Sequence, residues 1–292
     1  MTDPMQGVFA VATTPFSSDG EQDLAQLTRG LERVLSAGVD GVLLLGATGE
    51  AMALTAQEQE AQVRHAVDVV DGRVPLVAGC MDYRPADVVR RVAQAKEWGA
   101  AGAMVTPSYY GGLDAEVAVA ALDEVFAASE LPLILYNNPH SVGTDVLPEH
   151  MEPLLRHESF WAVKETSGAA TRVRELRDAL GDDVQVFVGA DGLALEGYTQ
   201  GAAGWVAASA WLLPEQCVAL ARAAESGDWA KAVELWDGLS APLSAIEGSP
   251  HFISLIKQTM GRLGFEQGPV RSPLGTASAA DVEALLSAVE RL

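Results

Sequence analysis

The chain has 292 residues, of which 49% are hydrophobic and 20% are charged, so it is long and apolar enough to bury a sizeable core. Acidic residues outnumber basic ones by 40 to 19, a formal net charge of −21. This charge argues against partners such as nucleic acid or an anionic membrane surface, because both would be repelled. The polar start and the lack of a long apolar run predict a soluble, cytoplasmic protein.

Short apolar runs alternate with helical patterns along the chain. The expected strands are bounded by Gly, Pro, Asp or Asn and are apolar on both faces, as in a parallel sheet; they cover residues 8–12, 39–45, 75–78, 102–105, 131–136, 160–164, 184–188 and 204–206. The expected helices that follow them cover residues 24–37, 56–70, 85–98, 115–128, 148–155, 170–180, 193–200 and 214–225.

Eight strand–helix units predict an α/β fold of the (β/α)₈ TIM-barrel type, with an open doubly wound sheet as the rival architecture. The barrel is expected to span residues 1–226. Residues 227–292 are expected to form a C-terminal helical extension packed on it, because helical patterns recur at 229–239, 251–263 and 281–292.

The active site of such a barrel lies at the carboxyl ends of its strands. Lys164 ends the apolar run 160–163, whereas the other three lysines lie in amphipathic helical stretches where a solvent-exposed lysine is ordinary; they are Lys96, Lys231 and Lys257. Apolar surroundings disfavour the charged form of an amine, so Lys164 is a candidate nucleophile for imine formation with a ketone. The alternative is a lysine that extends to solvent or pairs with Glu165.

Tyr136 ends the preceding expected strand. Strand alternation places it on the same face as Ile134, and Lys164 on the same face as Ala162, so a phenol and an amine are expected at one barrel mouth. Tyr136 is therefore a candidate acid/base group. The alternative is an aromatic side chain that packs beneath a loop.

A glycine-bounded loop, Gly46-Ala47-Thr48-Gly49-Glu50, follows the second strand. Its backbone N–H groups and the Thr48 hydroxyl can hold a carboxylate. A plain turn and a nucleotide-binding loop are the alternatives, although the dinucleotide fingerprint G-x-G-x-x-G is incomplete here. An oxidoreductase and a non-catalytic binding protein therefore remain rival hypotheses.

Two further features have more than one interpretation. Tyr109 and Tyr110 form an interface, a lid or a hydrophobic plug, and Asp191 either binds substrate hydroxyls or caps the following helix. The two cysteines, Cys80 and Cys217, and the five histidines show no metal-ligand spacing, so neither a metal site nor a disulfide framework is predicted.

Taken together, these segments resemble the dihydrodipicolinate synthase / N-acetylneuraminate lyase family of Schiff-base, class I aldolase-type TIM barrels. The resemblance runs from Gly7 to about Leu213. Its motifs are VATTPF at 11–16, GATGE at 46–50, TPSYY at 106–110, YNNP at 136–139, VKETSG at 163–168 and GADG at 189–192.

The resemblance implies a metal-independent lyase with no cofactor other than a covalent imine on Lys164. It implies that Tyr136 is the acid/base group and that Tyr109 is lent across a tight dimer interface, within a homotetramer built from two such dimers. Ala47 and Thr48 are expected to bind the carboxylate of a small-molecule keto-acid substrate. The remaining expected substrate-binding residues are Gly189, Asp191 and Ser209.

Several departures suggest that the chain is not a typical dihydrodipicolinate synthase. Ala47 replaces the first loop threonine, Ser141 replaces a carboxylate-binding arginine, and Trp211 replaces an asparagine. Gly192 replaces the glutamate typical of N-acetylneuraminate lyases. The expected activity is reversible aldol cleavage of a 2-keto-3-deoxy sugar acid, or a related 4-hydroxy-2-oxo acid, to pyruvate and an aldehyde. Dehydration of such an acid and 4-hydroxy-tetrahydrodipicolinate synthesis are the alternatives.

Overall fold

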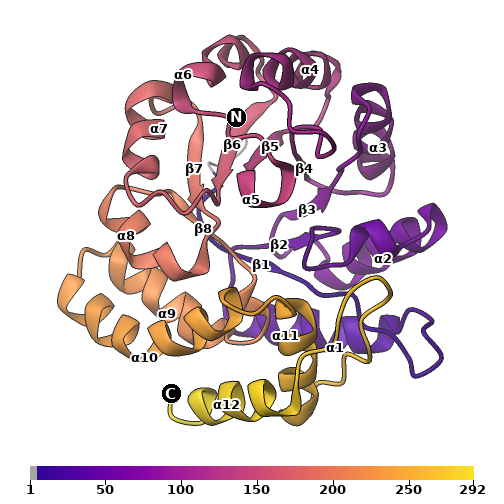
Figure 1. Ribbon diagram of the computed structural model, residues 1–292, viewed down its shortest axis with the longest axis vertical. Coiled ribbons are helices and arrows are strands. Elements are labelled where there is room, and N and C mark those ends of the chain that lie inside the picture. The colour runs from indigo at the N-terminus through magenta and orange to yellow at the C-terminus, as the bar shows by residue number, and fades with distance from the viewer. Residues whose placement is uncertain (1–4) are drawn as a thin grey trace.

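Eight parallel strands close into a barrel in chain order in the computed structural model, which describes residues 5–292 (Figure 1). β1 pairs with both β2 and β8, which closes the sheet and confirms the predicted TIM barrel over the rival open sheet. The strands are β1 (Gly7–Val11), β2 (Gly41–Leu44), β3 (Leu76–Gly79), β4 (Gly102–Val105), β5 (Leu133–Asn137), β6 (Phe160–Glu165), β7 (Gln185–Val188) and β8 (Gly204–Ala207).

Helices surround the barrel and connect successive strands. They are α1 (Leu24–Ser36), α2 (Ala56–Val70), α3 (Pro85–Glu97), α4 (Ala115–Ala128), α5 (Pro139–Val142), α6 (Pro148–Met151), α7 (Arg172–Leu180), α8 (Ala194–Thr199) and α9 (Pro214–Glu225). A capping box begins α2: the Glu58 amide donates to Thr55 Oγ1 at 3.2 Å, and the Thr55 amide donates to Glu58 Oε2 at 2.8 Å. No helix in the described chain is long and apolar enough to cross a bilayer.

The barrel interior is filled by side chains that alternate along the strands. Phe9 and Phe187 meet edge to face there, with ring centroids 5.6 Å apart. The members of this inner cluster are Met5, Phe9, Val11, Leu43, Val77, Met104, Ile134, Tyr136, Ala162, Phe187 and Val206. Because the interior is packed, substrate has access only to the open end above the last inward-facing residues.

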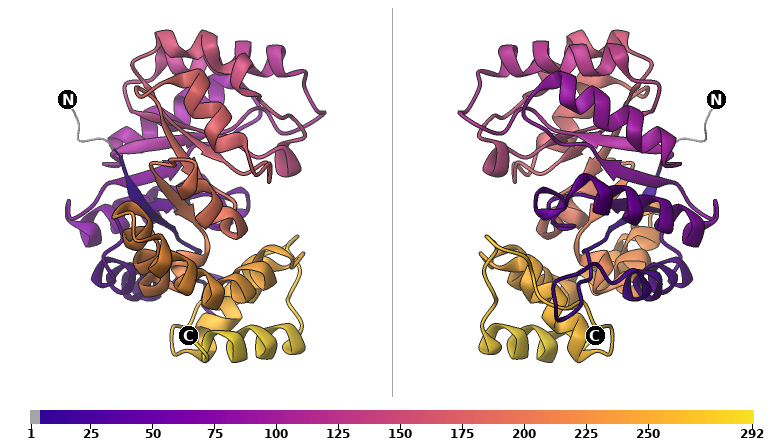
Figure 2. Two further views of the ribbon diagram at one scale, coloured as in Figure 1. Left: turned by 90° about the vertical axis from the view of Figure 1, so that its left-hand side faces the viewer. Right: turned by 90° about the vertical axis from the view of Figure 1, so that its right-hand side faces the viewer.

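Three helices follow the barrel: α10 (Trp229–Glu247), α11 (Phe252–Arg262) and α12 (Ala279–Val289). They lie along one side of the barrel, toward the end that carries α5 (Figure 2). The prediction ended the first of these helices at residue 239. Pro242 lies beyond that point and lacks the N–H that a helix interior needs. The structure continues the helix to Glu247, and the burial of Pro242, Leu243 and Ile246 offsets the missing hydrogen bond.

The proposed division of the chain after residue 226 stays a prediction. α10 packs directly on α9, the last helix of the barrel. Arg271, in the segment between α11 and α12, donates to Glu58 at the start of α2. The C-terminal extension is therefore bound to the barrel at two separated places.

Candidate active site

Lys164 and Tyr136 meet at the carboxyl ends of neighbouring strands. They are direct register partners in β5 and β6, and Lys164 Nζ lies 4.3 Å from the centroid of the Tyr136 ring. The pairing of β5 with β6 shifts by one residue between Leu133 and Ile134, which leaves Trp161 as the extra residue of β6. The shift restores Ala162 and Lys164 to the inward face, as strand alternation predicted.

The amine of Lys164 is buried and has no carboxylate partner. The side chain is 6% exposed, and Nζ forms no ion pair with any residue in the described range 5–292. Glu165 faces another way: its Oε2 accepts from Asn137 at 3.0 Å and its Oε1 accepts from the Ser167 amide at 2.5 Å. Neither alternative, a solvent-exposed lysine or a Lys164–Glu165 pair, is present.

Gly189, at the end of β7, leaves space for the Lys164 side chain. A Cβ atom at Gly189 would lie 2.8 Å from both Cγ and Cε of Lys164, and 2.0 Å from Thr166 Oγ1. Both distances are shorter than a van der Waals contact. Gly189 is thus placed beside the amine, where only glycine fits.

The variant Gly189→Ala is expected to displace Lys164 and to lower turnover strongly, with a loss of about 1–3 kcal/mol in the free energy of unfolding from overpacking. Gly238→Ala, in the exposed part of α10, is the matched control, because there the added methyl meets only the terminal Leu292 side chain. Denaturant titrations and steady-state assays of both variants check this. Normal turnover in Gly189→Ala would contradict it.

The hydroxyl of Tyr136 is held by a residue that sequence reasoning did not single out. Asn138 Nδ2 donates to Tyr136 Oη at 2.7 Å, and Asn138 Oδ1 accepts from the Ser141 amide at the start of α5 at 3.3 Å. Because the phenol oxygen already accepts a hydrogen bond, its own proton is available for a substrate. The sequence feature that could have identified Asn138 is the YNNP motif, in which an asparagine precedes a proline at the start of a helix.

The loop between β2 and α2 presents free backbone donors near this mouth. Leu45 and Glu50 adopt left-handed conformations, with φ of 57° and 55°, and so turn the chain sharply on both sides of the loop. Neither the Ala47 nor the Thr48 amide donates to another backbone group in the part of the chain that the structure describes. Thr48 is buried, so the loop has the donors that a carboxylate requires.

Glu50 fixes this loop to the C-terminal extension. Its Oε1 accepts from Lys257 Nζ at 2.8 Å, and its Oε2 accepts from the Arg271 amide at 2.8 Å. The prediction that Lys257 is a solvent-exposed helix lysine is wrong: the residue is 1% exposed, and Nζ also donates to the carbonyl oxygens of Thr14 and Pro269. Burial lowers the pKa of Lys257, while the charge of Glu50 opposes that effect.

Asp191 lies behind the mouth with both carboxylate oxygens occupied. Oδ1 accepts from the Trp205 indole at 2.8 Å, and Oδ2 accepts from the Ser209 amide at 2.8 Å. Burial raises the pKa of Asp191, against the opposing effects of those hydrogen bonds and of Lys164. The Asp191 side chain caps neither of the short helices that follow, so the alternative interpretation as a helix cap is not supported. Ser209 directs its hydroxyl toward Cys217 Sγ at 3.6 Å, and its role in substrate binding stays a prediction.

Two hydroxyls near the mouth have no hydrogen-bond partner. Thr106, which follows β4 on the inward face with Met104, is buried with Oγ1 unpaired within residues 5–292. Thr166 Oγ1, beside Gly189, is likewise buried and unpaired there. Buried hydroxyls without partners carry an energetic cost that a bound polar ligand would remove.

Tyr109 lies at the surface of the single chain, in the segment that follows β4. It is partly exposed and lies near Asp82 and Arg91, which follow β3. The exposed aromatic rings of Tyr83 and Tyr110 meet edge to face beside it, with centroids 6.4 Å apart. These three tyrosines form an exposed surface patch, and the expected catalytic role of Tyr109 across a dimer interface stays a prediction. Within the described residues, no cluster of three or more His, Cys, Asp or Glu side chains has metal-binding geometry.

Comparison with known proteins agrees with this arrangement. The sequence profile of the dihydrodipicolinate synthetase family matches residues 4–292. The chain belongs to this family. Its members are metal-independent Schiff-base lyases of the class I aldolase type, so the chain is a lyase.

Similar proteins cover almost the whole chain. The 4-hydroxy-tetrahydrodipicolinate synthase of Methanoculleus marisnigri is 31% identical over 96% of this chain and 97% of its own length. That of Exiguobacterium sibiricum is 32% identical over 92% of each chain. The crystal structure of dihydrodipicolinate synthase from Aquifex aeolicus superposes with a TM-score of 0.93 at 28% identity, over 98% of this chain and 97% of that one.

Proposed function

We propose that this chain forms or breaks a carbon–carbon bond between pyruvate and an aldehyde through an imine on Lys164. The observation that carries the proposal is the buried, unpaired amine of Lys164 at 4.3 Å from the Tyr136 ring. A lysine that pairs with no carboxylate and lies beside a phenol at the barrel mouth is placed to attack a ketone. The free amides of Ala47 and Thr48 would hold the keto-acid carboxylate.

In the synthetic direction, the Lys164 nitrogen attacks C2 of pyruvate, and the resulting carbinolamine loses water to give a protonated imine. The Tyr136 hydroxyl protonates the departing hydroxyl, and its oxygen then takes the C3 proton as the electron-withdrawing imine becomes an enamine. The enamine carbon attacks the aldehyde carbon, and the aldehyde oxygen takes a proton, for which Tyr136 is the donor in reach. Water then hydrolyses the imine and releases the product and the free lysine; cleavage runs the same steps backward.

The relatives support 4-hydroxy-tetrahydrodipicolinate synthesis as the first candidate reaction. Both of the curated relatives above carry that name, and they match nearly the full chain. All pyruvate aldolases of this type form the same imine. The names of the relatives therefore bear on which aldehyde reacts, and not on how the carbon–carbon bond forms.

Two features of this chain favour a second candidate, aldol cleavage of a 2-keto-3-deoxy sugar acid, with dehydration of the same acid through the same imine as the alternative chemistry. Ser141 is exposed beside Asn138, where a carboxylate-binding arginine would support an anionic aldehyde. Ala47 supplies no hydroxyl for a proton relay between tyrosines. Ser141 fits a neutral, hydroxylated aldehyde, whereas Ala47 favours dehydration.

Borohydride trapping tests the imine directly. The protein is incubated with pyruvate and sodium borohydride, digested, and analysed by peptide mass. The expected result is an irreversible adduct on the peptide that contains Lys164. Product formation from pyruvate with L-aspartate semialdehyde, or with glyceraldehyde, then distinguishes the two candidate reactions. No adduct on that peptide would refute the proposed function.

Tyr136→Phe is expected to permit imine trapping but to lower turnover by about 10²–10⁴-fold, the usual contribution of a positioned acid/base group. The ring is kept, so the packing around Lys164 is preserved. Tyr198→Phe, which removes a buried hydroxyl that has no hydrogen-bond partner in the described residues, is the matched control. Stopped assays of both variants check this, and unchanged turnover in Tyr136→Phe would show that its hydroxyl moves no proton.

We also propose that the patch of Tyr83, Tyr109 and Tyr110 is covered by a second copy of the chain, within a homotetramer of two tight dimers. Tyr110 is 77% exposed in the single chain, which is unusual for a large aromatic ring without a partner. Light scattering at assay concentration tests this assembly. A monomeric mass would contradict it.

A further inference from the structure

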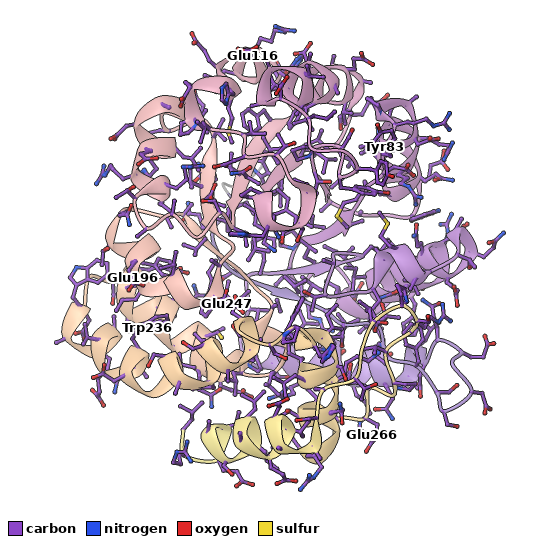
Figure 3. All side chains as sticks on the ribbon, in the orientation of Figure 1. Tyr83, Glu116, Glu196, Trp236, Glu247 and Glu266 are labelled. Carbon is purple, nitrogen blue, oxygen red and sulfur yellow. The ribbon has the colours of Figure 1, made fainter. Side chains whose placement is uncertain are left out.

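The C-terminal extension places a carboxylate at the barrel mouth. Glu247 ends α10, and its Oε2 accepts a hydrogen bond from the Gly192 amide at 2.8 Å, directly after β7 and Asp191. Figure 3 shows Glu247 inside the ring of barrel helices, whereas Glu196 and Trp236 lie farther out. A group that is 55 residues distant in sequence thus reaches the site.

Gly192 is the residue that admits this carboxylate. A Cβ atom at Gly192 would lie 2.6 Å from Glu247 Oε2, so a larger residue there would displace it. The space that a side chain at position 192 would take is therefore filled by the end of Glu247. The loop that follows β7 has no acidic side chain at the mouth other than the buried Asp191. Glu247, from the C-terminal extension, supplies a second one there.

The charges around Glu247 place it in the same electrostatic environment as the reacting amine. Glu247 is exposed at the open end of the barrel, yet partial desolvation of its carboxylate and repulsion from Asp191 raise the pKa of Glu247, while the Gly192 and Asp191 amides and the charge of Lys164 oppose that rise. Asp191 has both oxygens occupied by Trp205 and Ser209, whereas the carboxylate of Glu247 is held by the backbone amides of Gly192 and Asp191 and pairs with no side chain in the described residues. Thr166 Oγ1, buried beside Lys164, is also unpaired in the described chain.

We propose that Glu247 is a specificity-determining residue, which accepts hydrogen bonds from hydroxyl groups of the aldehyde half and disfavours aldehydes that end in a carboxylate. This inference rests on the proposed function, because it needs a keto acid bound to Lys164. A carboxylate acceptor pairs well with hydroxyl donors, and a second carboxylate brought close to it without a cation is repelled. Ser141, which carries no charge, provides no compensating cation.

A purely structural role for Glu247 predicts a different result. Through Gly192 it touches the short helical turn before α8, and loss of that contact would lower the turnover of every aldehyde equally. Glu247→Gln retains an oxygen that accepts from the Gly192 amide and removes only the charge. Glu234→Gln on the same helix is the matched control, since Glu234 pairs at the surface with Lys231.

The test compares condensation of pyruvate with D-glyceraldehyde and with succinic semialdehyde, which ends in a carboxylate. In the unaltered protein kcat/KM is expected to be higher for glyceraldehyde. In Glu247→Gln the ratio of the two kcat/KM values is expected to shift toward succinic semialdehyde by about tenfold, mainly through KM, which corresponds to one hydrogen bond to a charged group. Glu234→Gln is expected to leave the ratio unchanged.

Equal changes for the two aldehydes, or no change in Glu247→Gln, would overturn the inference. A preference of the unaltered protein for succinic semialdehyde, or pyruvate trapping without any condensation of glyceraldehyde, would also overturn it. Borohydride trapping of pyruvate is measured in the same preparations. Its failure in the unaltered protein counts against the proposed function itself, so the two failures are distinguishable.

Discussion

Replacement of Lys164 by methionine is expected to abolish borohydride trapping and to lower turnover by about 10³-fold or more, as loss of a covalent nucleophile does in other enzymes. Methionine has nearly the length of lysine and suits the apolar barrel interior, so the fold is expected to persist. Lys164 makes no ion pair in the described chain, and its loss leaves no carboxylate unpaired.

Lys96→Met is the control for this experiment. Lys96 lies on α3 and pairs at the surface with Glu130, so its removal should leave both trapping and turnover intact. The measurement is peptide mass after reduction with pyruvate, together with a steady-state assay. An adduct that persists in Lys164→Met would show that another amine forms the imine.

Lys257→Met is expected to lower the free energy of unfolding by about 3–5 kcal/mol, because it leaves the Glu50 carboxylate buried without its cation. The same change removes a contact that holds the loop of residues 46–50, which we propose binds the keto-acid carboxylate. KM for pyruvate is therefore expected to rise. The double variant Lys257→Met with Glu50→Gln removes both charges and is expected to regain part of the stability.

Urea titrations measure these differences. Lys231→Met is the control, because its pair with Glu234 is exposed and such pairs contribute about 0–1 kcal/mol. A Lys257→Met protein as stable as the control would show that the buried pair contributes little. A double variant less stable than Lys257→Met would show that Glu50 acts through its other partner, the Arg271 amide.

The barrel and the central pair of residues were predictable because both follow from local periodicity. Strands buried on two faces give continuous apolar runs, and alternation with period two places Lys164 with Ala162 and Tyr136 with Ile134. Parallel strands then bring their carboxyl ends to one face. The one-residue shift between β5 and β6 was not visible in the sequence, yet it does not disturb the result, because counting back from the strand end preserves the alternation.

The helix prediction failed where tertiary packing outweighed local propensity. Pro242 argues for a helix end, but its ring is buried against the core and α10 continues to Glu247. Because the predicted helix stopped at residue 239, the prediction did not reach the one acidic residue of this helix that enters the barrel mouth. Asn138 was likewise missed, because its bond to Tyr136 depends on the turn into α5.

The sequence by itself determined the barrel and the class of enzyme, and it indicated the amine that we propose forms the imine, because these depend on residue types at strand ends and on spacings within single strand–helix units. Only the tertiary structure decided which charges meet across the molecule. Lys257 pairs with Glu50, and Glu247 accepts a hydrogen bond from the Gly192 amide, although the partners are far apart in the sequence. No local pattern records such pairs, because their partners are selected by packing of the C-terminal extension on the barrel.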